Sequence, residues 1–153
     1  MNSRRLLWVA VGAIGLWVLT MHKKFNDIDF VARTIYGEAR GEGEEGMHAV
    51  ANVIMNRVNA KTWFGSSPKD VVLKEFQCSV WNVGDPNRAI IMAVTRDDPL
   101  FDTAYRIAEQ AIEGTLPDIT GGADHYHTTS VLPAWAADLA FQAQIGNHLF
   151  YVS

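Results

Sequence analysis

Residues 28–42 read IDFVARTIYGEARGE and combine a helical hydrophobic pattern with a signal that ends it. Apolar residues recur along this stretch at the three- and four-residue spacings typical of a helix with one buried face. They are Ile28, Val31, Ala32, Ile35, Tyr36 and Ala39. Gly41 and Gly43 then interrupt the pattern, because glycine is a poor helix former. The stretch therefore predicts a buried helix that ends soon after Ala39.

Glu38 lies at the edge of this apolar face, seven residues after Val31 and three after Ile35. A carboxyl group there loses part of its hydration, which raises its pKa and favours the protonated form near neutral pH. A protonated carboxylic acid in a cleft is what a glycosidase uses to protonate a leaving glycosidic oxygen. Glu42 follows four residues later, so a continuing helix would let each carboxyl group raise the pKa of the other. The alternative is that both are solvated charges at a helix end.

The remaining patterns predict a mainly helical domain with a small β element, an α+β fold. A second helix carries Met47, Val50, Ala51, Ile54 and Val58 on one face, a short helix runs from Ser67 to Glu75, and a further helix opens at Asp98-Pro99 and ends before Gly114. Pro133 predicts the start of a helix over residues 134–140. Residues 145–152 predict a closing strand that pairs with an extended segment at residues 123–129.

Histidines offer a rival interpretation of the C-terminal part. His125 and His127 alternate on an extended segment, which puts both rings on one face, and His148 could approach from a paired strand. Three histidines with Glu38 or Asp124 could bind zinc. The chain has neither an HExxH nor a CxxC motif, so the sequence favours neither a metal nor a cofactor.

Residues 76–81, FQCSVW, mix aromatic rings with short polar groups. Aromatic faces stack on sugar rings, while Gln77 and Ser79 can hydrogen-bond sugar hydroxyl or amide groups. The same β-branched and aromatic content equally predicts a strand that lines the core. Cys78 has no basic neighbour that would lower its pKa, which argues against a nucleophilic thiol. As the single cysteine, it also excludes an intramolecular disulfide.

The composition divides the 153 residues into a basic leader and an acidic body. The net charge is −4, with 48% hydrophobic and 20% charged residues, which argues against nucleic acid as a partner and against bulk disorder. Arg4, Arg5, Lys23 and Lys24 give residues 1–24 a charge of +4, because that stretch holds no acid. Residues 25–153 therefore carry −8 and are long enough for one domain.

Residues 6–21, LLWVAVGAIGLWVLTM, carry no charge. As a helix they would span about 24 Å, short of the roughly 30 Å of a hydrocarbon core. Trp8 and Trp17 lie near the two ends, where interfacial aromatic residues are favoured, and no small-residue cleavage site follows. We therefore predict that residues 1–24 are a weak, uncleaved membrane anchor in front of a domain at residues 25–153. A cleaved signal peptide and a buried N-terminal helix are the alternatives.

Several stretches resemble, in order and in register, the motifs of SleB/CwlJ-type cell wall hydrolases. They are residues 34–42, Gly46 with residues 49–53 and 56–58, residues 76–79, 120–123 and 125–127, Pro133 with Trp135, and residues 145–151. The resemblance covers about residues 28–152. It implies a lysozyme-like, mostly helical fold with a small sheet, which acts on the glycan strands of peptidoglycan.

The resemblance also places the family's catalytic glutamate on Glu38. The family is similar to lytic transglycosylases, in which one carboxyl group protonates the β-1,4 oxygen between N-acetylmuramic acid and N-acetylglucosamine. The same group then takes the proton of the muramic C6 hydroxyl, which closes a 1,6-anhydro ring. A hydrolytic muramidase would add a second carboxylate, for which Glu42 is the nearby candidate. The residues expected to line or support the cleft are Glu42, Gln77, Ser79, His125, Tyr126, Asn147 and His148.

The N-terminal segment without a wall-binding module looks like that of a phage endolysin with a signal-arrest-release segment. This likeness implies a monomeric enzyme held at the inner membrane through residues 6–21 and then released to the periplasm, where it causes cell lysis. A zinc-dependent wall amidase or peptidase and a non-catalytic wall-binding protein are the alternatives from other classes.

Overall fold

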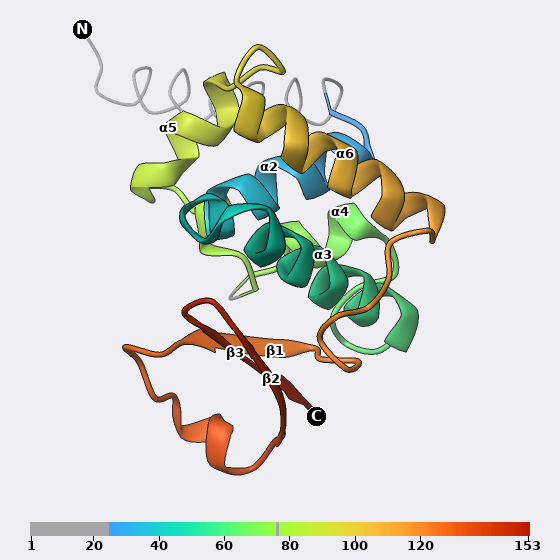
Figure 1. The fold of residues 1–153 in the computed structure, drawn as a ribbon, viewed down its shortest axis with the longest axis vertical. Coiled ribbons are helices and arrows are strands. Elements are labelled where there is room, and N and C mark those ends of the chain that lie inside the picture. Colours follow the sequence, from blue (N-terminus) through green and yellow to red (C-terminus); the bar gives the residue numbers. More distant parts are fainter. Residues whose placement is uncertain (1–24, 76) are drawn as a thin grey trace, which may run out of the picture.

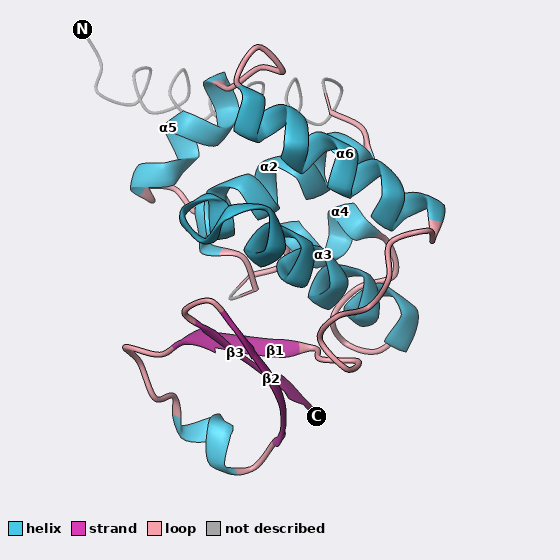
Figure 2. Ribbon diagram, in the orientation of Figure 1, coloured by secondary structure: helices cyan, strands magenta, loops and turns pink. Residues whose placement is uncertain are grey.

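A group of helices lies against a small antiparallel sheet in the computed structural model, which describes residues 25–75 and 77–153 (Figures 1 and 2). The helices are α2 (Asp27–Ala39), α3 (Gly43–Ala60), α4 (Pro68–Leu73), α5 (Pro86–Ala93) and α6 (Pro99–Glu113). The strands are β1 (His125–Thr128), β2 (Ala140–Ile145) and β3 (His148–Val152), and the short 3-10 helices are η1 (Arg40–Glu42), η2 (Ser79–Trp81) and η3 (Ala134–Ala137). The expected mainly helical fold with a small β element is confirmed.

The predicted anchor at residues 1–24 lies outside the described residues. Within residues 25–75 and 77–153, no helix has both the length and the apolar character needed to cross a membrane.

Helix α2 begins at a reciprocal capping pair and ends where the sequence predicts. The Asn26 side chain accepts a hydrogen bond from the Asp29 N–H at 2.9 Å, and the Asp29 carboxylate accepts one from the Asn26 N–H at 3.3 Å. After Ala39 the chain makes the single turn η1 and enters α3 through Gly43, whose φ of 71° favours glycine. The first two predicted helices are therefore confirmed.

Two hydrophobic clusters share helix α3. The larger cluster lies among α2, α3 and α6 and includes Phe30, Ile35, Ile54 and Phe101. The smaller one joins α3 to the sheet through Ala49, Val53, Ala123 and Phe150, all completely buried. Figure 1 shows α3 on the side of the helical group that faces the strands. Helix α3 therefore fixes the position of the sheet relative to α2.

The sheet has the order β1-β3-β2, so β1 is an edge strand. Its pairing with β3 confirms the predicted contact between residues 123–129 and the C-terminal strand. Two details of the prediction are wrong. Residues 145–152 are not one strand, because Gly146, with φ of 55°, and Asn147 turn the chain between β2 and β3. The helix expected over residues 134–140 is only the short η3, and Ala140 already begins β2.

The segment between α4 and α6 also departs from the expectation. Residues 79–81 form η2 rather than a strand, and the Trp81 indole N–H donates to Thr34 Oγ1 at 2.9 Å. Helix α4 stops at Leu73 instead of Glu75. The sequence prediction missed α5, although Asp85 caps it by accepting from the Asn87 N–H at 2.8 Å and is followed by proline.

Gly37 lies where η2 and α5 pack against α2. A Cβ atom there would lie 2.8 Å from Val80 Cγ1 and 2.9 Å from Ile91 Cγ2. We predict that Gly37→Ala lowers the free energy of unfolding by about 1–3 kcal/mol through overpacking. This cost exceeds the gain of roughly 0.5–1 kcal/mol from replacing a helical glycine.

Urea denaturation measures this change. Gly41→Ala is the control, since a Cβ at Gly41 meets nothing within 4 Å and is expected to leave stability nearly unchanged. A Gly37→Ala variant as stable as the parent chain would contradict the close packing of α2 and η2.

Candidate active site

A cavity of about 420 Å³ lies beside the edge strand β1 and the C-terminal end of α2. Its lining combines polar groups with aromatic rings from segments far apart in the sequence. They are Glu38, Arg57, Gln77, Ser79, Asn82, His125, Tyr126 and Trp135. The fold therefore brings together five of the residues that the sequence analysis selected for the cleft: Glu38, Gln77, Ser79, His125 and Tyr126.

The carboxyl group of Glu38 is the chemically distinctive group in this cavity. Burial raises its pKa above the ordinary value, and the charge of Asp85 raises it further. Hydrogen-bond donors oppose the shift, namely the Val80 N–H, the Tyr126 hydroxyl and the Ser79 N–H. Oε1 is buried and has no hydrogen-bond partner among the described residues. Glu38 therefore retains its proton to higher pH than an ordinary glutamate and has one oxygen free for a ligand.

Local packing places these donors at the carboxyl group. The absence of a side chain at Gly37 lets Val80 approach α2, and the hydrogen bond from Trp81 to Thr34 ties η2 to the same helix. The backbone N–H groups of η2 consequently face the last turn of α2, where Glu38 lies.

Among residues 25–75 and 77–153, Tyr126 is the side chain that donates a hydrogen bond to Glu38. Burial and the Glu38 charge raise the pKa of its hydroxyl well above the ordinary value, so the hydroxyl stays protonated and donates. Phe150 stacks on the Tyr126 ring at a centroid distance of 5.8 Å, and His148 packs edge-on at 5.4 Å. The smaller hydrophobic cluster thereby holds the hydroxyl in place.

Cys78 lies close enough to Glu38 for the two to interact electrostatically. Burial, reinforced by the Glu38 charge, raises the pKa of its thiol to about 12. The thiol is therefore uncharged at neutral pH, which gives no support to a nucleophilic cysteine.

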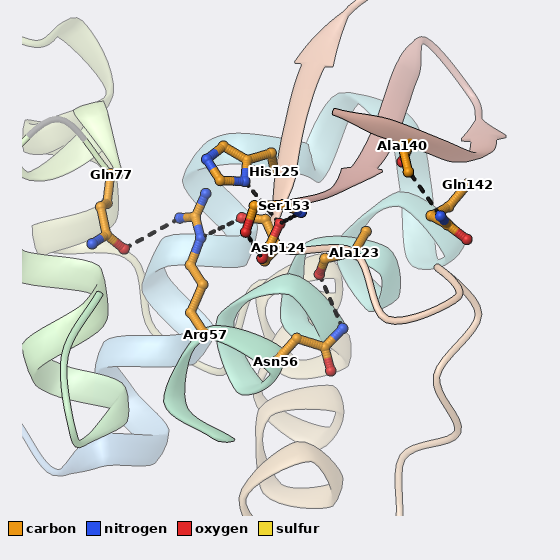
Figure 3. Close-up of polar contacts among 9 residues, drawn as sticks. All are labelled: Asn56, Arg57, Gln77, Ala123, Asp124, His125, Ala140, Gln142 and Ser153. Atoms are coloured by element: carbon orange, nitrogen blue, oxygen red, sulfur yellow. Dashed lines mark hydrogen bonds and ion pairs between the residues drawn. The ribbon is translucent and has the colours of Figure 1, made fainter. Parts of the chain in front are cut away.

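Arg57 forms the centre of a polar cluster at the cavity (Figure 3). Its Nε donates to the Asp124 carbonyl oxygen at 2.7 Å, and its Nη1 donates to Gln77 Oε1 at 3.4 Å. Gln77 in turn donates to the Phe64 carbonyl at 3.0 Å, and His125 Nδ1 lies 2.8 Å from Asp124 Oδ1. These bonds join α3, the segment before η2 and β1 into one wall.

Three predicted site residues lie outside the cavity lining. Glu42 accepts two hydrogen bonds from Asn147, one from its N–H at 2.8 Å and one from its Nδ2 at 3.1 Å. These bonds, with the backbone one first, lower the pKa of Glu42. Because α2 ends at Ala39, the continuing helix on which mutual pKa raising depended does not form. Glu42 and Asn147 instead link η1 to the β2–β3 turn. His148 packs edge-on against the Tyr126 ring.

The histidines that suggested zinc do not converge. The register of β1 and β3 pairs His125 with Tyr151 and His127 with Leu149, whereas His148 pairs with Thr128 and lies on the opposite face. Across residues 25–75 and 77–153, no group of three or more histidine, cysteine, aspartate or glutamate side chains is arranged to hold a metal ion.

The sequence analysis missed three residues that line the cavity: Arg57, Asn82 and Trp135. The position of Arg57 could have indicated its role, because it falls three residues after Ile54 on the buried face of α3. A charged residue is rarely buried there unless it has a partner or a function. Trp135 lies 5.2 Å from the His125 ring only because the segment around η3 folds back toward β1. No local pattern contains that information.

Comparison with known proteins identifies spore cortex-lytic enzymes as relatives of the chain. The chain is 32% identical over 126 residues to a spore cortex-lytic enzyme of Halalkalibacterium halodurans, covering 82% of this chain and 34% of that protein. It is 57% identical over 88 residues to the spore cortex-lytic enzyme of Bacillus subtilis, covering 52% of this chain and 28% of that protein. The chain thus spans about a third of the length of these curated relatives.

Two solved structures share the fold. The catalytic domain of the germination-specific lytic transglycosylase SleB from Bacillus anthracis superposes with a TM-score of 0.66 at 27% identity, over 84% of this chain and 98% of that one. The catalytic domain of the Bacillus cereus SleB protein gives 0.66 at 28% identity, over 82% and 89%. A family model described as Cell Wall Hydrolase matches residues 41–151. The chain therefore belongs to the cell wall hydrolase family.

Proposed function

We propose that this chain cleaves the β-1,4 bond between N-acetylmuramic acid and N-acetylglucosamine in peptidoglycan, as a lytic transglycosylase with Glu38 as general acid. The observation that carries the proposal is the free, buried Oε1 of a carboxyl group whose surroundings favour its protonated form. The likeness to solved SleB catalytic domains, one of them that of a germination-specific lytic transglycosylase, supports the same reaction.

The composition of the cavity favours an intramolecular nucleophile. Glu38 donates its proton to the glycosidic oxygen, and the muramic C6 hydroxyl attacks the anomeric carbon to close a 1,6-anhydro ring. Hydrolysis through two carboxylates needs a second one within about 5–10 Å of the first. Among the described residues that line the cavity, Glu38 is the sole carboxylic acid, and Asp85, whose charge acts on Glu38, is not part of that lining. The aromatic ring of Trp135 offers a face for a sugar ring.

Loss of the acidic group at position 38 is expected to stop the reaction. Glu38→Gln keeps the shape of the side chain but cannot donate a proton, so we expect glycan cleavage to fall by about 10²–10⁴-fold. Release of soluble muropeptides from purified sacculi measures the rate, and mass spectrometry of the products is expected to show 1,6-anhydro ends.

Glu45→Gln at the exposed start of α3 is the matched control and is expected to cleave normally. Near-normal release by Glu38→Gln would disprove the role of Glu38. Reducing ends alone would assign the chain to the hydrolytic muramidases, and peptide or amide cleavage would assign it to the amidase alternative.

The buried carboxyl group of Glu38 is also expected to lower the free energy of unfolding at high pH. Its pKa in the folded chain is raised, so ionisation above that pKa destabilises the folded state relative to the unfolded one. Below the unfolded pKa both states are protonated and this penalty is absent. We therefore expect Glu38→Gln to be more stable than the parent chain at pH 8, with the difference shrinking toward pH 4.

Chemical denaturation at the two pH values measures the difference in unfolding free energy. The same comparison for Glu45→Gln gives the background for an exposed carboxylate. Equal stability of Glu38→Gln and the parent chain at both pH values would contradict a raised pKa of Glu38.

We further propose that residues 6–21 tether the chain to the inner membrane before its release to the periplasm as an endolysin. The support is the sequence alone, in which Gly12 and Gly15 weaken an apolar segment that is already short.

Gly12→Leu combined with Gly15→Leu is expected to keep the protein in the membrane fraction after a protonophore and to delay lysis. Gly12→Ser with Gly15→Ser is the control and should be released. Equal release of all forms would refute the tether.

A further inference from the structure

The cavity holds a second reactive group that the acid Glu38 does not use. His125 lines the cavity, and its Nδ1 lies 2.8 Å from the Asp124 carboxylate. Ser153 fixes that carboxylate through its N–H at 3.0 Å and its hydroxyl at 2.7 Å (Figure 3). Although burial opposes ionisation, the bonds from His125 and Ser153 lower the pKa of Asp124 overall. Asp124 is therefore ionised at neutral pH and accepts a hydrogen bond from the Nδ1–H of His125.

This hydrogen bond decides which ring nitrogen of His125 is free. With the proton on Nδ1, the neutral imidazole carries its lone pair on Nε2. No described residue hydrogen-bonds Nε2, and the rings of Trp135 at 5.2 Å and Phe64 at 5.7 Å hold the imidazole in place. A carboxylate that orients a histidine in this way is the arrangement that prepares a general base.

Arg57 adds a donor on the same wall. Its Nε and Nη1 are occupied by Asp124 and Gln77, and among the described residues its Nη2 has no hydrogen-bond partner. Arg57 donates to the carbonyl of Asp124 and His125 bonds its carboxylate, so the two side chains lie beside the same residue, and both line the cavity. A hydroxyl group placed there can accept from Arg57 and donate to His125.

We propose that His125 is the general base for the attacking hydroxyl, with Arg57 binding the hydroxyl oxygen and Asp124 as the positioning residue. This inference rests on the proposed function. It assigns to His125 the removal of the C6 hydroxyl proton, which the single-carboxyl mechanism gives to Glu38. The C1–O4 bond breaks first and leaves an oxocarbenium-like C1. The O6–C1 bond then forms on the same face while the O6–H proton passes to His125 Nε2. The Glu38 proton goes to the leaving O4. Solvent then returns the proton from the imidazolium to the Glu38 carboxylate, so the cycle closes without another reactant.

Chemical rescue tests the proposal. His125→Ala removes the base and leaves a space for free imidazole, so we expect kcat on purified sacculi to fall by about 10²-fold with little change in KM. Added imidazole is expected to restore part of the rate in a saturable manner, with 1,6-anhydro ends among the products. Asp124→Asn is expected to lower kcat in the parent chain and to add little in the His125→Ala background.

His127→Ala is the matched control, because this histidine lies on the same strand face but is buried against the Tyr151 hydroxyl at 3.1 Å. Imidazole is expected to give it no increase in rate. Circular dichroism checks that each variant is folded, and His125→Gln replaces His125→Ala for the kcat comparison if the alanine variant unfolds.

Two results would overturn the assignment: a folded His125 variant with the parent kcat, or a loss of kcat that imidazole does not restore in folded His125→Ala. Activity in Glu38→Gln would instead overturn the proposed function. An inactive Glu38→Gln beside an unimpaired His125→Ala removes only the base assignment.

Discussion

A largely buried carboxyl group at the end of α2 is the constraint on which the rest of the structure depends. Burial of Glu38 disfavours its charge, and so does its place near the negative end of the α2 dipole. The chain tolerates this cost because η2 supplies backbone donors and the sheet supplies Tyr126. Gly37 and the Trp81–Thr34 hydrogen bond hold η2 at the required distance. Features that would otherwise look unrelated therefore serve one polar group.

The sheet contributes to the cleft because β1 is its edge strand. Neighbouring residues of a strand point to opposite faces, yet at an edge both can line one cavity. Tyr126 packs with Phe150 toward α3, while His125 lies with Trp135 on the other face. Helix α3 contacts the residues on both faces of β1: Val53 packs in the cluster beside Tyr126, and Arg57 bonds Asp124 next to His125. An acid and a histidine from different elements thus line one cavity.

The features that were predictable from sequence are those encoded locally. Helical periodicity and the glycines that follow Ala39 predicted α2 and α3. The position of Glu38 at the edge of an apolar face indicated its desolvation. The contact of Glu42 with Asn147, 105 residues apart, has no local signal, nor does the fold-back that brings Trp135 to His125. The helix predicted over residues 134–140 from proline followed by alanine forms only the short η3, because Ala140 already begins β2, which pairs with β3. Tertiary contacts, not propensity, decide that segment.

The central claim is that the fold keeps Glu38 protonated beyond the range of an ordinary glutamate, and carbon NMR titration of the glutamate carboxyl groups tests it directly. The resonance lost in Glu38→Gln identifies Glu38, and Glu42 serves as a reference in the same spectrum. We predict that Glu38 titrates above the ordinary glutamate pKa and Glu42 below it. A Glu38 resonance that titrates at or below the ordinary value would contradict the account.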